Sequence, residues 1–346
     1  MINLLKEVAR GKRGARDLSM EESLQAAEWI MTRKATPAQI GAFFIAERIK
    51  MESVEELEAF VTVLRKHAER APVRKGIDCA GPYDGRKKSF MATFPTAFVL
   101  AAAGLPVTLH SAPSLPPKWG TTLLDLLLEM GIDAQRMQKD ALIRVAEATG
   151  VLFVPAEMWC PPLKELRSIR EELGMRTVLN SAEKLVNYSG SPYIVYGVYH
   201  NTVFERMSKL IQNLQYEKAL IVQGPEGSED MFIDRATRTY IVDGGEPRLH
   251  VVNPDEYGLE TPLPEKENGW TAADQLRVTE EVLRGEAHMA FTNQVMLCGA
   301  VRLHLAGRVG SVEEGVYTCK SLLDSGAALD IFRTWCGAML GKEQLI

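Results

Sequence analysis

Between residues 76 and 224, short apolar runs alternate with longer amphipathic stretches, and this alternation constrains the fold more than any other feature. The apolar runs read IDCAG, PVTLH, VLFVPAEMW, SPYIVYGVY and ALIVQG. Buried strands that alternate with crossover helices are typical of a largely parallel sheet. We therefore predict a large α/β domain with a mainly parallel sheet over residues 76–346. The helices between the strands are expected near 94–104, 121–130, 161–174 and 201–214.

The N-terminal 70 residues have a different pattern, one that favours helices alone. Ser19, Thr36 and Ser53 are each followed three residues later by Glu or Gln, which is the signature of a capping box at a helix start. Apolar residues recur at helical spacing after each of these positions. We predict a small helical domain over residues 1–70, joined by helices around 161–190.

The C-terminal third of the chain is predicted to leave the alternating pattern. Residues 230–275 are rich in turn formers (VDGGEP, VNPDEYGLETPLPEKENG), which favours an antiparallel excursion or extended loops. Ser311 fits a helix cap, and we expect the last helix over 322–335.

Composition narrows the classes of function. The chain of 346 residues carries 40 Lys and Arg against 45 Asp and Glu, so its net charge of −5 disfavours a protein that coats nucleic acid but allows a local basic groove. It contains no apolar run of 18 residues, and its N-terminus lacks the apolar core of a signal peptide. Five scattered cysteines without a C-x-x-C pair are typical of reduced thiols. We expect a cytoplasmic protein with no membrane partner.

Residues 79–93, CAGPYDGRKKSFMAT, lead from the first predicted strand into a helix. This is where α/β proteins usually hold phosphates, and the two glycines, the aspartate and three basic residues suit an anionic ligand. Pro82, Tyr83, Phe90 and Met91 are bulky where a phosphate cradle uses glycine and hydroxyls. The segment predicts either a working, a rebuilt or a lost phosphate site.

Several collinear segments resemble one known family. They are TPAQIGAFFIAERIKMESVEEL, FVLAAAGLPVTLH, REELGMRTVLN, YIVYGVYHNTVFERMSKLIQNLQYEKALIVQG and AGRVGSVEEGVYTCKSLLDSGAAL. In these the chain resembles the anthranilate phosphoribosyltransferases and their relatives in glycosyltransferase family 3, as a divergent branch. The resemblance implies a nucleoside phosphorylase/phosphoribosyltransferase-like fold with the site between the two domains. It also implies a homodimer through the helical domain, with which the apolar helix over 36–50 is compatible.

The resemblance also implies candidate residues for phosphoribosyl pyrophosphate (PRPP) and Mg. The family's GTGGD loop falls on residues 80–84, where Asp84 is kept, and its Asn-x-Ser-Thr turn falls on 91–94, where Thr93 leaves one hydroxyl of three hydrogen-bonding side chains. Its acidic metal pair becomes Glu229-Asp230, in reversed order. The implied donor- or anion-binding set is Gly81, Asp84, Gly85, Arg86, Lys88, Thr93, Lys118 and Thr121.

His110 and Arg170 fall on the family's acceptor-binding positions, while the family's Gly-Pro after the strand becomes Glu183-Lys184. Other interpretations stay open for each candidate: a solvated turn for the basic residues 86–88, an acid-rich helix N-terminus for Glu229-Asp230, a structural His110, and a helix-surface ion pair for Arg170.

Three functions follow from the resemblance. The first is transfer of a pentosyl phosphate from a PRPP-like donor to an unknown acceptor, with Mg, at full or reduced activity. The second is a non-catalytic protein of the same fold that binds nucleic acid or another anion. The third, nucleoside phosphorolysis, is disfavoured because the phosphate-binding Lys-x-Ser-Thr-Gly-Gly pattern is missing.

Overall fold

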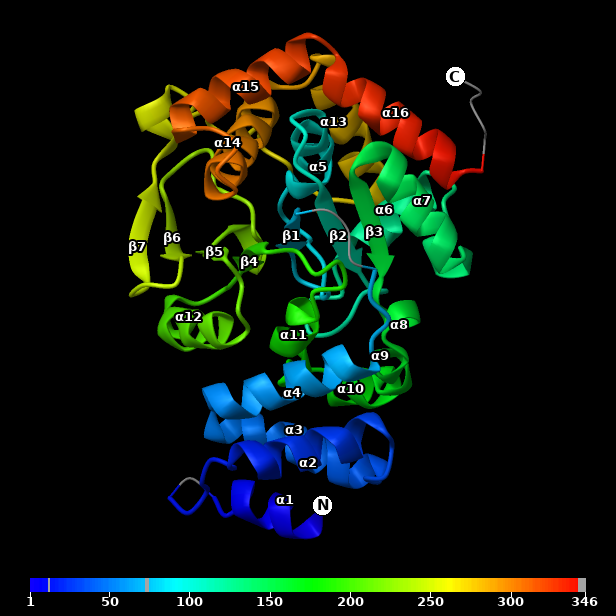
Figure 1. The fold of residues 1–346 in the computed structure, drawn as a ribbon, viewed down its shortest axis with the longest axis vertical. Coiled ribbons are helices and arrows are strands. Elements are labelled where there is room, and N and C mark those ends of the chain that lie inside the picture. Colours follow the sequence, from blue (N-terminus) through cyan, green and yellow to red (C-terminus); the bar gives the residue numbers. More distant parts are fainter. Residues whose placement is uncertain (12, 72–74, 342–346) are drawn as a thin grey trace.

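The structure, a computed structural model, describes residues 1–11, 13–71 and 75–341 and consists of a helical part below an α/β part (Figure 1). A seven-stranded sheet has the order β3-β2-β1-β4-β5-β6-β7. The first five of these strands are parallel, and β6 and β7 add antiparallel to one edge. The strands are β1 Ile77–Ala80, β2 Val107–Ser111, β3 Val151–Pro155, β4 Tyr193–Gly197, β5 Lys218–Val222, β6 Thr237–Val242 and β7 Arg248–Val252.

This sheet confirms the predicted α/β class and the antiparallel excursion after residue 230. The strands β1, β2 and β3 are buried along their whole length, which is why their sequences are continuous apolar runs. The predicted helices between strands are present as α5 Thr93–Ala102, α6 Leu123–Glu129, α9 Pro161–Glu165, α10 Arg167–Leu173 and α12 Phe204–Asn213.

Helices of the α/β part form a layer above and beside α5 and the sheet in Figure 1. The prediction of a last helix over 322–335 was wrong: α15 ends at Asp324 and a separate helix follows. Gly326 adopts a left-handed backbone conformation (φ 78°), which interrupts the helical hydrogen bonds between the two. The helices of this layer are α7 Lys139–Thr149, α13 Ala272–Arg284, α14 Met289–Leu305, α15 Val312–Asp324 and α16 Ala327–Met339.

The helical part is made of α1 Ile2–Val8, α2 Met20–Met31, α3 Pro37–Lys50 and α4 Val54–His67. The three predicted capping boxes are confirmed, since each cap side chain accepts from the backbone N–H three residues later. Ile40, Phe43 and Phe44 are buried inside this bundle, with Phe43 and Phe44 against Phe60. They therefore stabilise the domain itself, and the homodimer stays a prediction.

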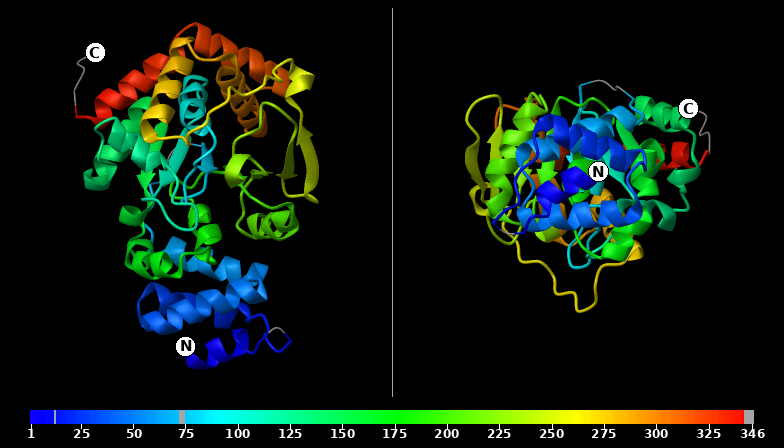
Figure 2. Two further views of the ribbon diagram at one scale, coloured as in Figure 1. Left: turned by 180° about the vertical axis from the view of Figure 1, so that it is seen from behind. Right: turned by 90° about the horizontal axis from the view of Figure 1, so that it is seen from below.

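Helices inserted between β3 and β4 return to the helical part. The segments α9, α10 and α11 (Leu179–Ala182) pack on α3 and α4, while the short α8 (Ala156–Trp159) follows β3 directly. Figure 2 shows the same two-part arrangement from behind. In the described part of the chain, no helix has the length and apolar character needed to cross a bilayer.

A buried carboxyl in the helical part gives a pH-dependent prediction. Burial and the neighbouring Glu56 raise the pKa of Glu47 to about 8 from 4.5. The folded state therefore holds a proton on Glu47 that the unfolded state loses above 4.5. The stability that this proton confers is complete below pH 4.5 and is lost as the pH rises through 8.

We expect Glu47→Gln to remove this dependence. Urea unfolding at about pH 5 and about pH 8 should show the wild type losing more stability over that interval than the variant does. Equal losses in the two proteins would contradict the assignment, because all other titrating groups are shared.

Candidate ligand site

Loops that follow β1, β2 and β5 meet at the carboxyl ends of these parallel strands, the usual ligand position in α/β sheets. They bring together most of the site residues that were predicted from the sequence. Their backbones are linked directly, because the N–H of Arg86 donates to the carbonyl of Thr121 and the N–H of Thr121 donates to the carbonyl of Arg86, both at 2.8 Å. The nominated residues that meet here are Gly81, Asp84, Gly85, Arg86, Thr93, Lys118, Thr121, Glu229 and Asp230.

Close approach of the two loops depends on two glycines. Gly85 has a positive φ of 72°, and a Cβ there would overlap the carbonyl of Gly120. The N–H of Gly120 donates to the carbonyl of Asp84 at 2.9 Å. The backbone donors of Arg86, Gly120 and Thr121 are thus used between the loops and are not free to hold a diphosphate.

Arg86 points into the protein and is only 2% exposed. Its Nη2 lies 2.7 Å from Oδ2 of Asp230 and 3.8 Å from Oε2 of Glu229, and its Nη1 donates to the carbonyl of Phe90 at 2.7 Å. The interpretation of this residue as part of a solvated turn is therefore wrong. Arg86 is an internal counter-ion of the acidic pair.

A second arginine, which the sequence analysis missed, approaches the same carboxylates. Arg302 of α14 is fully buried, and its Nη2 lies 3.1 Å from Oδ1 of Asp230 and 3.2 Å from the carbonyl oxygen of Glu229. The N–H of Thr93 donates to Oδ2 of Asp230 at 3.2 Å. Both oxygens of Asp230 therefore already have donors.

The residues present do not fit Mg. A divalent cation needs several free oxygen ligands, whereas Glu229 and Asp230 face two guanidinium groups that would repel it. Across residues 1–11, 13–71 and 75–341, no group of three or more His, Cys, Asp or Glu could hold a metal. The pair also does not begin a helix, since irregular chain follows the 3-10 turn at Pro225–Gly227.

Glu226 takes up the remaining donors of the loop. Its carboxylate accepts from the N–H groups of Lys87 and Lys88 at 3.0 and 2.9 Å and from the hydroxyl of Ser89 at 2.7 Å. Burial alone would raise the pKa of Glu226, but these hydrogen bonds hold it below 4.5. A side chain of the protein thus occupies a nest of N–H groups that would suit a phosphate.

The space left among these loops is about 20 Å³, enough for roughly one water molecule. Lys118 donates to the carbonyl of Glu226 at 2.9 Å and lies 3.0 Å from Oδ1 of Asp84, so its amine links the two loops that carry these residues. Little open space is therefore left at the loop that the family resemblance assigns to phosphate binding.

The two predicted acceptor residues also have partners within the protein. The ring of His110 lies between the hydroxyl of Tyr83, 2.7 Å from Nδ1, and Oδ1 of Asp78, 3.0 Å from Nε2. Arg170 makes a two-pronged contact with Glu183 at 2.6 and 3.0 Å, and both side chains are buried. This pair is neither a surface pair within one helix nor a group that faces an open cavity.

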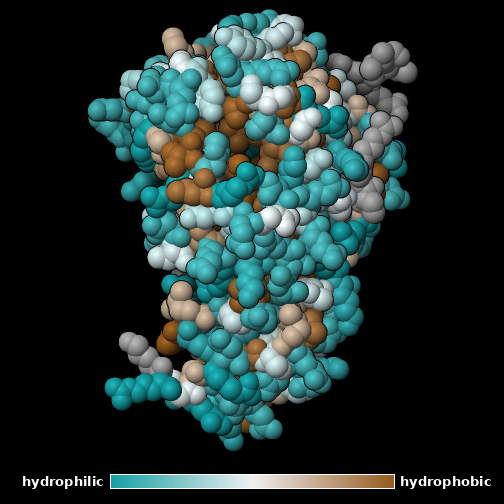
Figure 3. Space-filling view, turned by 60° about the vertical axis from the view of Figure 1, so that its left-hand side comes forward, coloured by the Kyte–Doolittle hydropathy of each residue, from teal (hydrophilic) through white to brown (hydrophobic). Residues whose placement is uncertain are grey.

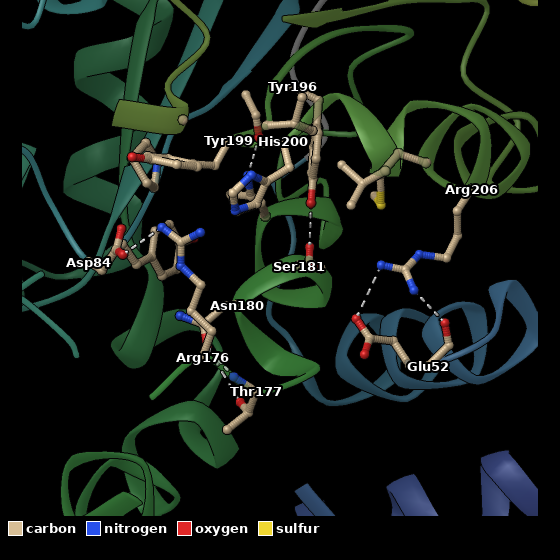
Figure 4. Close-up of a pocket in the computed structure, with 18 of the residues that line it drawn as sticks. Glu52, Asp84, Arg176, Thr177, Asn180, Ser181, Tyr196, Tyr199, His200 and Arg206 are labelled. Carbon is tan, nitrogen blue, oxygen red and sulfur yellow. Dashed lines mark hydrogen bonds and ion pairs between the residues drawn. The ribbon is translucent and has the colours of Figure 1, made fainter. Parts of the chain in front are cut away.

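An open cavity of about 330 Å³ lies beside these loops, between the helical part and the α/β part (Figure 4). Arg176 lies 3.0 Å from Asp84 in this cavity, and Arg206 pairs with Glu52 at 3.7 Å. Arg48 contacts only a backbone carbonyl in the described part of the chain. These three arginines have no local signal in the sequence, because α3, α12 and the segment before α11 bring them together from distant positions.

Comparisons with known proteins agree with this architecture. Residues 2–68 match the helical bundle domain and residues 81–329 the a/b domain of a glycosyl transferase family. The chain is 30% identical over 331 residues to the anthranilate phosphoribosyltransferase of Persephonella marina, covering 95% of this chain and 97% of the relative. It is 32% identical over 319 residues to that of Thermomicrobium roseum, covering 90% of each.

Solved structures show the same fold. The anthranilate phosphoribosyltransferase of Thermus thermophilus superposes with a TM-score of 0.83 at 23% identity, covering 97% of this chain and 99% of that chain. The Saccharomyces cerevisiae enzyme in complex with PRPP and Mg superposes with a TM-score of 0.81 at 18% identity, covering 98% of both. On the matched domains and the identities over nearly its whole length, this chain belongs to glycosyl transferase family 3.

Proposed function

We propose that this chain binds a phosphorylated small molecule in the cavity between its two parts and does not transfer phosphoribosyl groups from Mg–PRPP. The observation that carries this proposal is the ion pair between Arg86 and Asp230. The guanidinium nitrogen of Arg86 lies 2.7 Å from the carboxylate that the family resemblance assigns to the metal. Glu226 in the N–H nest and the filled space of about 20 Å³ support it.

The cavity between the two parts has the charge that an anion needs. Two carboxylates, Asp84 and Glu52, face a larger number of cations, and each is already engaged by one arginine. A guanidinium binds phosphate oxygens in a two-pronged geometry. The arginines that line the cavity are Arg48, Arg176 and Arg206, and Lys184 and His200 line it as well.

Calorimetry with ribose 5-phosphate and pyrophosphate tests this assignment. We expect binding to the wild type that Arg176→Ala and Arg206→Ala each weaken by about tenfold or more, the loss of a charge-assisted contact. Lys209→Ala is the matched control, because this exposed lysine of α12 does not line the cavity. Equal affinities in all four proteins, or no heat at millimolar probe, would contradict the assignment.

Binding of single-stranded nucleic acid is a second candidate, favoured by another cavity of about 790 Å³. Figure 3 shows hydrophobic surface gathered on the α/β part, on the side that lies to the left in Figure 1. The cavity combines aromatic side chains, among them Phe232 and Trp270, with cations, and Arg235 lies 3.8 Å from the ring centroid of Phe232. Aromatic stacking beside cations suits single strands. The cations are Lys88, Arg235, Arg238 and Lys266.

A gel-shift series with an oligonucleotide against salt concentration tests this second candidate. Binding through these cations must weaken steeply as salt rises. Binding that is absent, or insensitive to salt, would exclude it.

A further inference from the structure

Lys184 is a buried amine at the wall of the cavity between the two parts. It belongs to the 3-10 turn Glu183–Leu185 and is 7% exposed. Its Nζ donates to the carbonyl of Gly197 at 2.6 Å and lies 3.9 Å from the ring centroid of Tyr196. In the described part of the chain it forms no ion pair with a carboxylate, an unusual state for a buried lysine.

The surroundings of Lys184 favour the neutral amine. Burial first, and then the charge of Arg176, lower the pKa of Lys184 to about 7, although Glu229, Asp84 and Glu183 oppose the shift. His200 and Arg206 line the same cavity. Near neutral pH a substantial share of the amine therefore has its lone pair free, as a nucleophilic lysine requires.

Lys118 shows why Lys184 is distinct. Burial lowers the pKa of Lys118 as well, but its Nζ lies 3.0 Å from Oδ1 of Asp84 and donates to the carbonyl of Glu226. That lysine joins two loops through an ion pair. Lys184 has no such carboxylate partner in the described residues and lines open space.

We propose that Lys184 forms an imine with the carbonyl group of a phosphorylated aldehyde or ketone bound in this cavity. The proposal rests on the proposed function, since Arg176 and Arg206 would hold the phosphate while the carbonyl reaches Lys184. The amine nitrogen bonds to the carbonyl carbon, and the carbon–oxygen bond then breaks. The oxygen leaves as water with the two amine hydrogens, so no oxidant or reductant takes part.

Pyridoxal 5′-phosphate, a phosphorylated aldehyde, is a suitable probe. Incubation followed by borohydride reduction and peptide mass spectrometry should place one predominant adduct on Lys184. Lys184→Met and Lys184→Arg should each reduce total labelling by about tenfold, whereas Lys209→Met should leave it unchanged. Pyridoxal, which lacks the phosphate, should label Lys184 about tenfold less.

The pH profile gives a second readout. Labelling of Lys184 should be half-maximal near pH 7, whereas exposed lysines require a pH of about 10. Labelling that is spread over surface lysines, and whose total amount is the same in both Lys184 variants as in the wild type, would contradict the imine proposal. If ribose 5-phosphate still binds in that case, the proposed function stands and only the imine fails; if it does not bind, both fail.

Discussion

Replacing Arg86 with alanine is expected to destabilise the protein by about 3–5 kcal/mol, the usual cost of removing one partner of a buried ion pair. Asp230 and Glu229 are almost completely buried, and the guanidinium of Arg86 lies 2.7 Å from Asp230. Without it, the remaining positive charge of Arg302 faces two carboxylates. The bond from Arg86 to the carbonyl of Phe90 is lost as well.

Urea unfolding of the variant measures this effect. Lys87→Ala is the matched control: the adjacent side chain is exposed, and its loss should change stability by less than about 0.5 kcal/mol. Adding Asp230→Asn to Arg86→Ala should recover part of the stability, because it removes a carboxylate that has lost its partner. A loss below about 1 kcal/mol for Arg86→Ala would contradict the counter-ion role.

Replacing Glu183 with alanine is the second change with a large expected effect, again about 3–5 kcal/mol of destabilisation. It leaves the guanidinium of Arg170 buried without its two-pronged partner. Glu172→Ala, an exposed position on the same helix as Arg170, is the control and should be nearly neutral.

A double variant separates the ion pair from general packing. Arg170→Met with Glu183→Met replaces both charges by apolar groups, so it should be clearly more stable than Glu183→Ala alone. Equal stability of the double variant and Glu183→Ala would show that the charges are not the cause.

The secondary structure was predictable from sequence because its signals are local. Three capping boxes and five apolar runs each lie within a few residues of the element that they specify. The last helix was misplaced because helical periodicity continues through residue 325, and only the left-handed Gly326 divides it.

The site was predictable in position but not in what occupies it. The loops near 81–93 and 118–121 meet where the strand order requires. The direction of Arg86, however, depends on Asp230, which lies 144 residues later in the chain (230 minus 86). One local signal was available for Arg302, a lone charge in the apolar run CGAVRLHL of α14. A charge in such a run usually has a buried partner.

Family resemblance has the same limit. It aligns Glu229-Asp230 with a metal pair and residues 80–84 with a phosphate loop, yet it carries no information about side chains new to this chain. The carboxylate of Glu226 accepts from backbone N–H groups of the loop that the family resemblance assigns to phosphate. The guanidinium of Arg86 contacts Asp230, which the family resemblance assigns to the metal. Fold membership is therefore shown, while function depends on these two contacts.

A calorimetric titration of the wild-type protein with PRPP, with and without Mg, tests the central claim most directly. We predict that Mg adds no heat and no affinity at millimolar PRPP, and that any PRPP binding is weakened by Arg176→Ala and not by the control Lys209→Ala. Tight binding of PRPP that requires Mg and is unaffected by Arg176→Ala would contradict the account.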